Sequence, residues 1–137
     1  MDNYRIENRA IEPKEYQALR NSTGWLPLQE NVVRKALERD LFSICISDHD
    51  KVIGIGRIIG DGAIYFYIQD VIVLPEYQGK GIGKLIMENI EEFIKKNANN
   101  NSFVGLMAAD GVKEFYHKYE YIERSCDKPG MFKIIKK

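Results

Sequence analysis

Residues 69–84 read QDVIVLPEYQGKGIGK, and this stretch decides the fold. A strand-like run ends at Pro75, which has no N–H for a strand ladder, and glycines then alternate at positions 79, 81 and 83. A helical hydrophobic period begins at once and continues to Asn97. A helix start offers free N–H groups and the positive end of the helix dipole, and glycines place no Cβ in the way. The stretch therefore predicts a binding site for phosphate groups.

Two common phosphate-binding loops do not match this stretch. A Walker loop, G-x-x-x-x-G-K-[ST], would need a glycine in place of Gln78 and a hydroxyl side chain in place of Leu85. A dinucleotide-binding loop, G-x-G-x-x-G, would need its last glycine in place of Lys84 or Ile86. The predicted site is of another kind, and Lys80 and Lys84 add positive charge to it.

The rest of the sequence alternates between strand-like and helical periods. Apolar spacing and turn residues predict helices at 13–21, 29–39, 83–97 and 112–119, and strands at 4–6, 42–46, 52–59, 64–73, 103–108, 121–124 and 131–135. Antiparallel hairpins therefore come first and a strand–helix–strand unit follows, which is a mixed α/β (α+β) arrangement. Gly54 and Gly56 lie inside a strand and open no helix, so we interpret them as structural.

The long strand at 64–73 divides its side chains between two faces of the sheet. Strict alternation places Asp70 on the face of Ile68 and Ile72, and it places Gln69 on the face of Tyr67 and Val71. Asp70 therefore points away from Gln69 unless a β-bulge intervenes.

Length and composition predict a single domain covering residues 1–137. Lys and Arg number 20, as do Asp and Glu, so the net charge is +0 and a broad basic surface for nucleic acid or an anionic membrane is excluded. No run approaches the ~20 apolar residues that span a bilayer, and residues 1–5 do not start a signal peptide. Two cysteines and two histidines lack metal-site spacing, so we expect no metal and a cytoplasmic location.

The phosphate-site stretch resembles the coenzyme motif of the GNAT superfamily, the acetyl-CoA-dependent N-acetyltransferases. Their pattern [QR]-x-x-G-x-[GA], after a strand ending V-x-P, is met at 78–83 and 73–75. A second family motif, F-Y-x-K-x-G-[FY], resembles residues 115–121. The resemblance implies the GNAT fold, a mostly antiparallel sheet of six to seven strands flanked by about four helices. Within the superfamily, the coenzyme motif is most similar to glucosamine-phosphate acetyltransferases.

The resemblance also implies roles for individual residues around acetyl-CoA as co-substrate. Main-chain groups of Val71, Ile72 and Val73 would contact the pantetheine arm and the acetyl carbonyl. Tyr116 would lie beside the coenzyme sulfur. The pyrophosphate would be held by Gln78, Gly79, Lys80, Gly81, Ile82, Gly83 and Lys84.

Two positions depart from the family pattern. The glycine of the second motif is Glu120, so a backbone position that favours a left-handed conformation is shifted or strained. The asparagine that many members carry seven residues before the tyrosine is Ala109.

Acetyl transfer to an amine sets the chemistry that the site must supply. An alkylamine of pKa ~10.4 must lose a proton, the tetrahedral oxyanion needs N–H donors, and the departing thiolate needs a proton. A phenol can donate that proton, so Tyr116 is the candidate general acid. The amine proton would pass to Asp70 or along a water chain to Asp70 or to bulk solvent.

In this family the acceptor is contacted by the segment between the first two helices and by loops near the C-terminus. These segments and the long strand place Trp25, Tyr67, Gln69 and Arg124 as candidate substrate-binding residues. Trp25 either forms a wall of the acceptor pocket or fills the core beneath its loop.

These features together predict an N-acetyltransferase that transfers the acetyl group from acetyl-CoA directly to a primary amine of a small molecule. Two alternatives remain: a non-catalytic acyl-CoA-binding or regulatory module on the same fold, and a protein or peptide N-acetyltransferase. Dimers are frequent in the superfamily, so the resemblance allows a homodimer.

Overall fold

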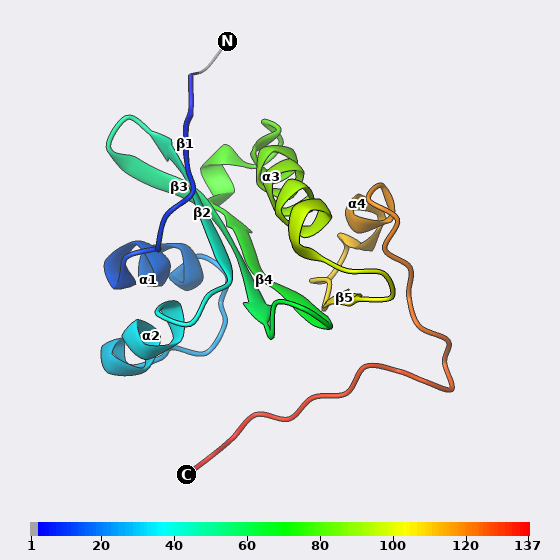
Figure 1. Cartoon of the computed structure of the whole chain (residues 1–137). Helices are drawn as coiled ribbons and strands as arrows, with labels where there is room; N and C mark the ends of the chain where they lie inside the picture. The colour runs from blue at the N-terminus through cyan, green and yellow to red at the C-terminus, as the bar shows by residue number, and fades with distance from the viewer. Residues whose placement is uncertain (1–2) are drawn as a thin grey trace.

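The computed structural model describes residues 3–137, which form a five-stranded mixed sheet with helices on both faces (Figure 1). The strands follow the chain in the order β1 (Arg5–Glu7), β2 (Phe42–Asp48), β3 (Lys51–Gly60), β4 (Tyr65–Val73) and β5 (Phe103–Leu106). The helices are α1 (Pro13–Asn21), α2 (Glu30–Leu37), α3 (Ile82–Asn97) and α4 (Lys113–His117), with a short 3-10 turn, η1 (Pro75–Tyr77), before α3.

The core has two layers, one on each side of the sheet. Helices α1 and α2 cover one face, and α3 covers the other (Figure 1). Helix α3 forms where the sequence predicts it because isoleucines recur at helical spacing, and Ile82, Ile86 and Ile90 are fully buried against the sheet. This packing fixes the start of α3 beside the end of β4.

The two glycines of β3 allow α3 to approach the sheet closely. A Cβ added to Gly54 would lie 2.9 Å from Ile82 Cγ2, and one added to Gly56 would lie 2.6 Å from Ile86 Cγ2. Real Cβ atoms do not come this near to other side chains. The structural interpretation of these glycines is therefore confirmed.

A β-bulge in β4 changes the face on which its side chains lie. Arg57 pairs with Gln69 and Ile55 pairs with Ile72, so Gly56 alone stands opposite two residues, Asp70 and Val71. Asp70 has a φ of 55°, in the left-handed region. Ile68 pairs with Ile58 and lies on the sheet face that α3 covers. Asp70 instead turns toward α1, on the other face. The prediction of strict alternation along 64–73 is therefore wrong beyond the bulge.

Strands β4 and β5 separate halfway along β4. They pair in parallel from Tyr65 with Phe103 to Ile68 with Leu106, and this pairing does not extend to the bulge. The main-chain groups of β4 from Asp70 onward are therefore left without a strand partner on that side, and residues 107–112 form the loop opposite them.

The expectation of six to seven strands is wrong, since five form within residues 3–137. Residues 121–124 and 131–135 are not strands, although their composition is typical of strands. A strand needs a neighbouring strand for its N–H and C=O groups, and residues 121–124 and 131–135 have none among the described residues. Instead, residues 122–137 form a C-terminal arm without regular structure that projects from the body (Figure 1).

We expect Gly56→Ala to lower the free energy of unfolding by about 1–3 kcal/mol, because the added methyl overpacks the contact with α3. Gly130→Ala is the matched control: nothing lies within 4 Å of a Cβ there, and we expect a change within about 0.5 kcal/mol. Urea unfolding of both variants measures the difference. Equal stabilities would show that the glycine is not needed for helix packing.

Candidate active site

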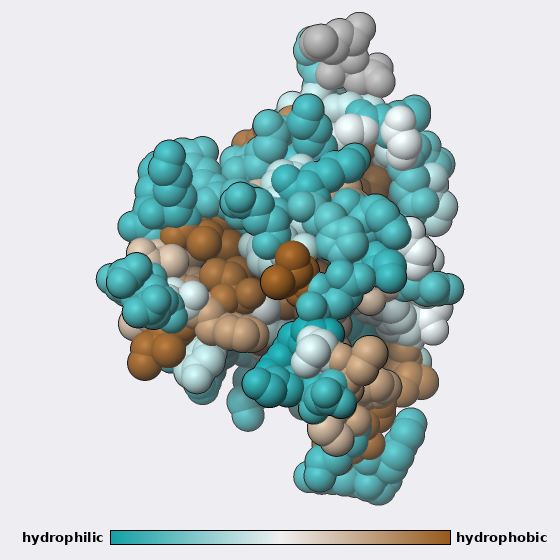
Figure 2. Space-filling view, turned by 90° about the vertical axis from the view of Figure 1, so that its right-hand side faces the viewer, coloured by the Kyte–Doolittle hydropathy of each residue, from teal (hydrophilic) through white to brown (hydrophobic). Residues whose placement is uncertain are grey.

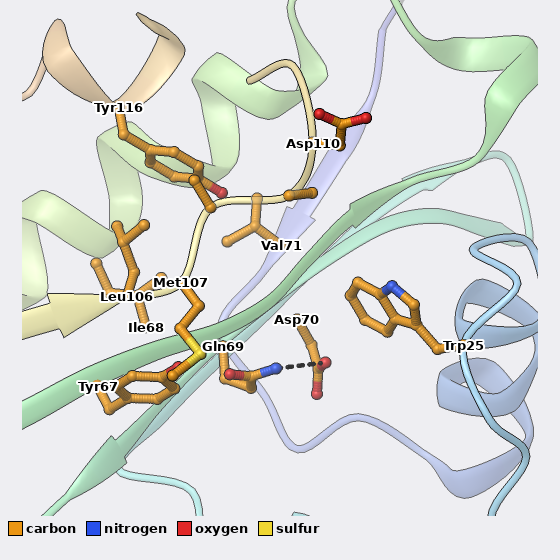
Figure 3. A pocket seen from close by; sticks show the side chains of 12 residues that line it. Trp25, Tyr67, Ile68, Gln69, Asp70, Val71, Leu106, Met107, Asp110 and Tyr116 are labelled. Carbon is orange, nitrogen blue, oxygen red and sulfur yellow. Dashed lines mark hydrogen bonds between the residues drawn. The ribbon is translucent and has the colours of Figure 1, made fainter. Parts of the chain in front are cut away.

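A pocket of about 330 Å³ opens where β4 and β5 separate (Figure 3). It is bounded by the bulge of β4, the loop after β5, helix α4 and the loop between α1 and α2. The twelve lining residues are Trp25, Tyr67, Ile68, Gln69, Asp70, Val71, Leu106, Met107, Ala108, Ala109, Asp110 and Tyr116. Five residues that the sequence singled out for acceptor binding or proton transfer thus lie around one cavity: Trp25, Tyr67, Gln69, Asp70 and Tyr116.

The bulge brings the carboxylate of Asp70 to this pocket and holds it in place. Its Oδ2 accepts hydrogen bonds from the Tyr16 hydroxyl and from Arg57 Nη1, each at 2.7 Å. Its Oδ1 accepts only a longer bond of 3.2 Å, from Gln69 Nε2 (Figure 3). Oδ2 is therefore occupied by two strong donors, while Oδ1 keeps capacity for a further donor.

Arg57 joins Asp70 to a second buried carboxylate. Its Nη2 donates to Asp40 Oδ1 at 2.8 Å, and Ser43 donates to the other oxygen of Asp40 at 2.6 Å. Burial disfavours the charged guanidinium, but the hydrogen bonds and charges of Asp40 and Asp70 outweigh burial and raise the pKa of Arg57. Arg57 therefore stays charged, and its guanidinium holds the Asp70 carboxylate in place while also pairing with Asp40.

Tyr116 contributes a phenol from the opposite side of the pocket (Figure 3). The side chain is partly buried, and its hydroxyl has no hydrogen-bond partner among residues 3–137. Burial raises the pKa of Tyr116, so the phenol remains protonated at neutral pH. A protonated hydroxyl without a partner at a pocket wall can donate to a bound group.

Two aromatic side chains, Trp25 and Tyr67, also line the pocket. Trp25 is 41% exposed and stacks with the guanidinium of Arg20, 5.5 Å from the ring centroid. It is therefore a wall of the pocket, and the alternative that it fills the core is wrong. The pKa of Tyr67 is raised by burial and by the nearby charge of Asp70.

The start of α3 has the geometry expected of a phosphate site. Gly79 and Gly81 have φ values of 78° and 83°, which L side chains rarely adopt, and no atom lies within 4 Å of a Cβ placed on either. Gln78 Nε2 donates to the carbonyl of Val73 at 3.1 Å and ties the turn to the end of β4. No acidic residue lies in the first turn of α3, and the side chains of Lys80 and Lys84 are exposed.

Two predicted coenzyme residues can contribute only their main chain. The side chains of Ile72 and Ile82 are 4% and 1% exposed and belong to the core. Free N–H groups in the first turn of a helix do not depend on the side chain, so Ile82 still fits the predicted phosphate site. Within the part of the chain that the structure describes, no three His, Cys, Asp or Glu side chains come together as a metal site.

A comparison with family models gives one match over most of the chain. The acetyltransferase (GNAT) domain matches residues 16–134, which include the bulge, the start of α3 and Tyr116. The chain belongs to the GNAT family of acetyltransferases.

Relatives with names and structures agree with this assignment. A crystal structure from methicillin-resistant Staphylococcus aureus, of a probable acetyltransferase of unknown function, is 33% identical. It superposes with a TM-score of 0.92 over 97% of this chain and 100% of that chain. An uncharacterised N-acetyltransferase (ycf52-like) from Prochlorococcus marinus is 34% identical over 79% of this chain. The chain spans 61% of that protein's length.

A glucosamine-6-phosphate N-acetyltransferase structure from Arabidopsis thaliana superposes with a TM-score of 0.68, over 96% of this chain and 100% of that chain. Its identity to this chain is 18%, which shows the GNAT fold alone. The similarity of the coenzyme motif to glucosamine-phosphate acetyltransferases therefore stays a prediction.

One predicted substrate-binding residue does not line the pocket. Arg124 lies in the C-terminal arm, outside the pocket that contains Trp25 and Asp70. Glu120, which replaces the family glycine, has a φ of 71° and keeps the left-handed conformation. A non-glycine residue in this conformation adds local backbone strain.

Sequence reasoning missed the residues that support Asp70, namely Tyr16, Arg57 and Asp40. One signal was available, because Arg57 is the only charged residue between Val52 and Ile59, a strand that is otherwise apolar. A charged side chain in a buried strand requires an opposite charge nearby. Which carboxylate supplies it depends on the bulge and on loop packing, so the sequence could not identify the partner.

Proposed function

We propose that this GNAT protein transfers the acetyl group of acetyl-CoA directly to a primary amine of a small molecule. The observation that carries the proposal is that Asp70 and Tyr116 both line one pocket beside the open part of β4. The phosphate site at the start of α3 follows directly after this strand, so one extended coenzyme can reach both. The expected cellular location stays the cytoplasm.

The coenzyme would lie along the gap between β4 and β5. Residues Gln78 to Lys84 would hold the pyrophosphate, and the main chain of Val71, Ile72 and Val73, which has no strand partner on the β5 side, would bind the pantetheine arm and the acetyl carbonyl. An N–H group in this part of β4 would stabilise the oxyanion of the tetrahedral intermediate. In the proposed reaction the amine attacks the thioester directly, so neither a metal ion nor a covalent enzyme intermediate is needed.

Acetyl transfer then needs two proton movements. The amine nitrogen attacks the thioester carbonyl, a C–N bond forms, and the C–S bond breaks as the intermediate collapses. Asp70 Oδ1 accepts the amine proton directly or through a water molecule. Tyr116 gives its phenolic proton to the departing sulfur and regains one from solvent.

The pocket lining favours a cationic acceptor with an apolar body. Asp70 and Asp110 supply two carboxylates, Trp25 and Tyr67 supply aromatic surface, and no Lys or Arg is among the lining residues. Arg20 lies against Trp25, but its Nε and Nη1 already donate to the Leu26 carbonyl and the Tyr16 hydroxyl. Carboxylates and aromatic rings attract ammonium groups and disfavour a phosphate. We therefore propose an arylalkylamine or similar amine rather than a phosphorylated amino sugar.

Release of free thiol from acetyl-CoA across a panel of acceptors tests the proposed substrate class. The panel contains arylalkylamines, polyamines, aminoglycosides, amino sugars with and without phosphate, and short peptides, with an amine-free control for hydrolysis. We expect the highest kcat/KM with an arylalkylamine. A higher value with an amino-sugar phosphate or a peptide would contradict the proposed acceptor. Acetyl-CoA binding without thiol release would favour the non-catalytic module.

The role of Asp70 is tested on the best acceptor with Asp70→Asn, and Asp50→Asn in the exposed turn between β2 and β3, outside the pocket lining, is the matched control. Loss of the carboxylate removes both the attraction for the ammonium and the proton acceptor, so we expect kcat/KM to fall about 10²-fold. The control should change it less than about 5-fold. Unchanged affinity for acetyl-CoA would show that the Asn variant is folded. An unchanged kcat/KM in that folded variant would remove Asp70 from the mechanism.

We expect Tyr116→Phe to lower kcat about 10²-fold, because the departing thiolate loses its proton donor. Affinity for acetyl-CoA should change little, since the ring remains. Stopped-flow thiol detection gives kcat, and calorimetry gives the affinity. Tyr119→Phe is the matched control, because its ring packs on Phe115 and is not part of the pocket lining. Equal turnover in the two variants would contradict the role of Tyr116.

A further inference from the structure

Arg20, in the last turn of α1, contacts two parts of the acceptor pocket without lining it. Its Nη1 donates to the Tyr16 hydroxyl at 3.1 Å, and that hydroxyl donates to Asp70 Oδ2 at 2.7 Å. Its Nε donates to the Leu26 carbonyl at 3.1 Å, and its guanidinium carbon lies 5.5 Å from the centroid of the Trp25 ring. One planar side chain therefore connects the carboxylate of the pocket with its aromatic wall.

The loop that carries Trp25, residues 22–29, is not anchored in the hydrophobic core. The Trp25 side chain is 41% exposed, and no side chain of the loop is buried. Gln17 Nε2 donates to the Leu28 carbonyl at 2.8 Å and holds the end of the loop that leads into α2. The position of the Trp25 ring relative to α1 therefore depends on the contacts that Arg20 makes.

The same guanidinium directs the hydrogen bond that Asp70 receives from Tyr16. Tyr16 is buried, and its hydroxyl has a single proton to donate. Because Arg20 donates to the phenolic oxygen, the Tyr16 proton is turned to Asp70 Oδ2. Oδ1 of Asp70 stays the oxygen that can accept a bond from an incoming ammonium group.

The side of the pocket next to α4 offers an acceptor a broad apolar surface. Figure 2 looks onto the side that carries α4 and shows hydrophobic atoms gathered in a hollow there. A groove of about 530 Å³ adjoins the pocket on this side, and the two share the lining residues Tyr67, Leu106, Met107, Ala108 and Tyr116. The wall formed by Trp25 is therefore the one that can set a fixed distance from Asp70 (Figure 3).

We propose that Arg20 is a positioning residue that determines acceptor specificity, because it holds the Trp25 ring at a fixed distance from the Asp70 carboxylate. This inference rests on the proposed transfer to an amine. An acceptor whose ammonium group donates to Asp70 Oδ1 would lay its apolar body against Trp25. With both contacts positioned by one side chain, the number of bonds between the amine and the ring of the acceptor must match that distance. A Trp25 wall that moved freely would accept many lengths.

A series of phenylalkylamines, from benzylamine to phenylbutylamine, tests the proposal with acetyl-CoA as the donor. Wild type should prefer one chain length, with kcat/KM about 10-fold lower for the neighbouring lengths, because one methylene too many or too few is worth about this much in a fitted pocket. In Arg20→Met we expect the values to agree within about 3-fold, through a higher KM for the best amine. The kcat for that amine and the affinity for acetyl-CoA should change little.

Arg34→Met is the matched control for this series. Arg34 lies on α2, pairs with Glu30 at 3.0 Å in an exposed position, and is outside the pocket lining. This variant should keep the preference of wild type. A preference that Arg20→Met leaves intact, or one that both variants lose equally, would overturn the proposal.

Two further variants separate positioning from charge. Arg20→Lys keeps the positive charge but lacks the planar fork that reaches both Tyr16 and Leu26, so it should lose the preferred length as Arg20→Met does. Trp25→Leu should lose it as well. Combining Arg20→Met with Trp25→Leu should change kcat/KM less than about 2-fold beyond the single variants, because both act on one wall. Additive effects, or a wild-type preference in Arg20→Lys, would contradict the positioning role.

Trp25 is the only tryptophan of the chain, so its fluorescence reports on the wall without any acceptor. We expect acrylamide to quench this fluorescence more strongly in Arg20→Met than in wild type or Arg34→Met, because the released loop opens more often. Equal quenching would overturn the inference. If no amine is acetylated, the proposed function fails, and quenching still decides whether Arg20 holds Trp25. If wild type acetylates all lengths equally well, the proposed function stands and the inference fails.

Discussion

The carboxylate of Asp70, held by Arg57 and Tyr16 at the bulge of β4, is the interaction on which the pocket depends. Both hydrogen bonds are 2.7 Å long, and the Asp70 side chain is 1% exposed. Removing one partner of such a buried ion pair costs about 3–5 kcal/mol because the other charge is left unpaired. Asp40 also pairs with Arg57, so two carboxylates share one guanidinium and the network has one acidic group more than basic groups.

The bulge has two consequences for acetyl transfer. It turns Asp70 toward α1 and the acceptor side, while Val71 and Val73 keep their side chains away from it. It also lies just beyond the last pair of β4 and β5, at Ile68 and Leu106, so the main chain opens where the acetyl group would lie. One irregularity in one strand therefore places a carboxylate on one side of β4 and main-chain groups without a strand partner on the other. Tyr116, from α4, closes the arrangement from the far side.

The sequence predicts the glycine turn and helix α3 better than the pocket around Asp70. The glycines at 79 and 81 and the isoleucine spacing of α3 act within a few residues of the chain, so they can be interpreted without knowing the tertiary structure. The bulge depends on how β3 and β4 align, which strict alternation cannot show. The Asp40–Arg57–Asp70 network joins residues up to 30 positions apart, so pattern reasoning missed it. The prediction of strands at 121–124 and 131–135 is wrong for a third reason: a segment of strand-like composition forms a strand only when a neighbouring strand is present.

The most direct test of the coenzyme geometry is an amide ¹H–¹⁵N spectrum recorded during titration with acetyl-CoA. If the gap between β4 and β5 holds the coenzyme, the largest shifts will come from Val71 to Val73 and from Gly79 to Lys84, and they will saturate together. Residues of β1 and of the hairpin between β2 and β3 should not respond. Saturable shifts confined to other parts of the chain, or no shifts at millimolar coenzyme, would contradict the assignment of this site.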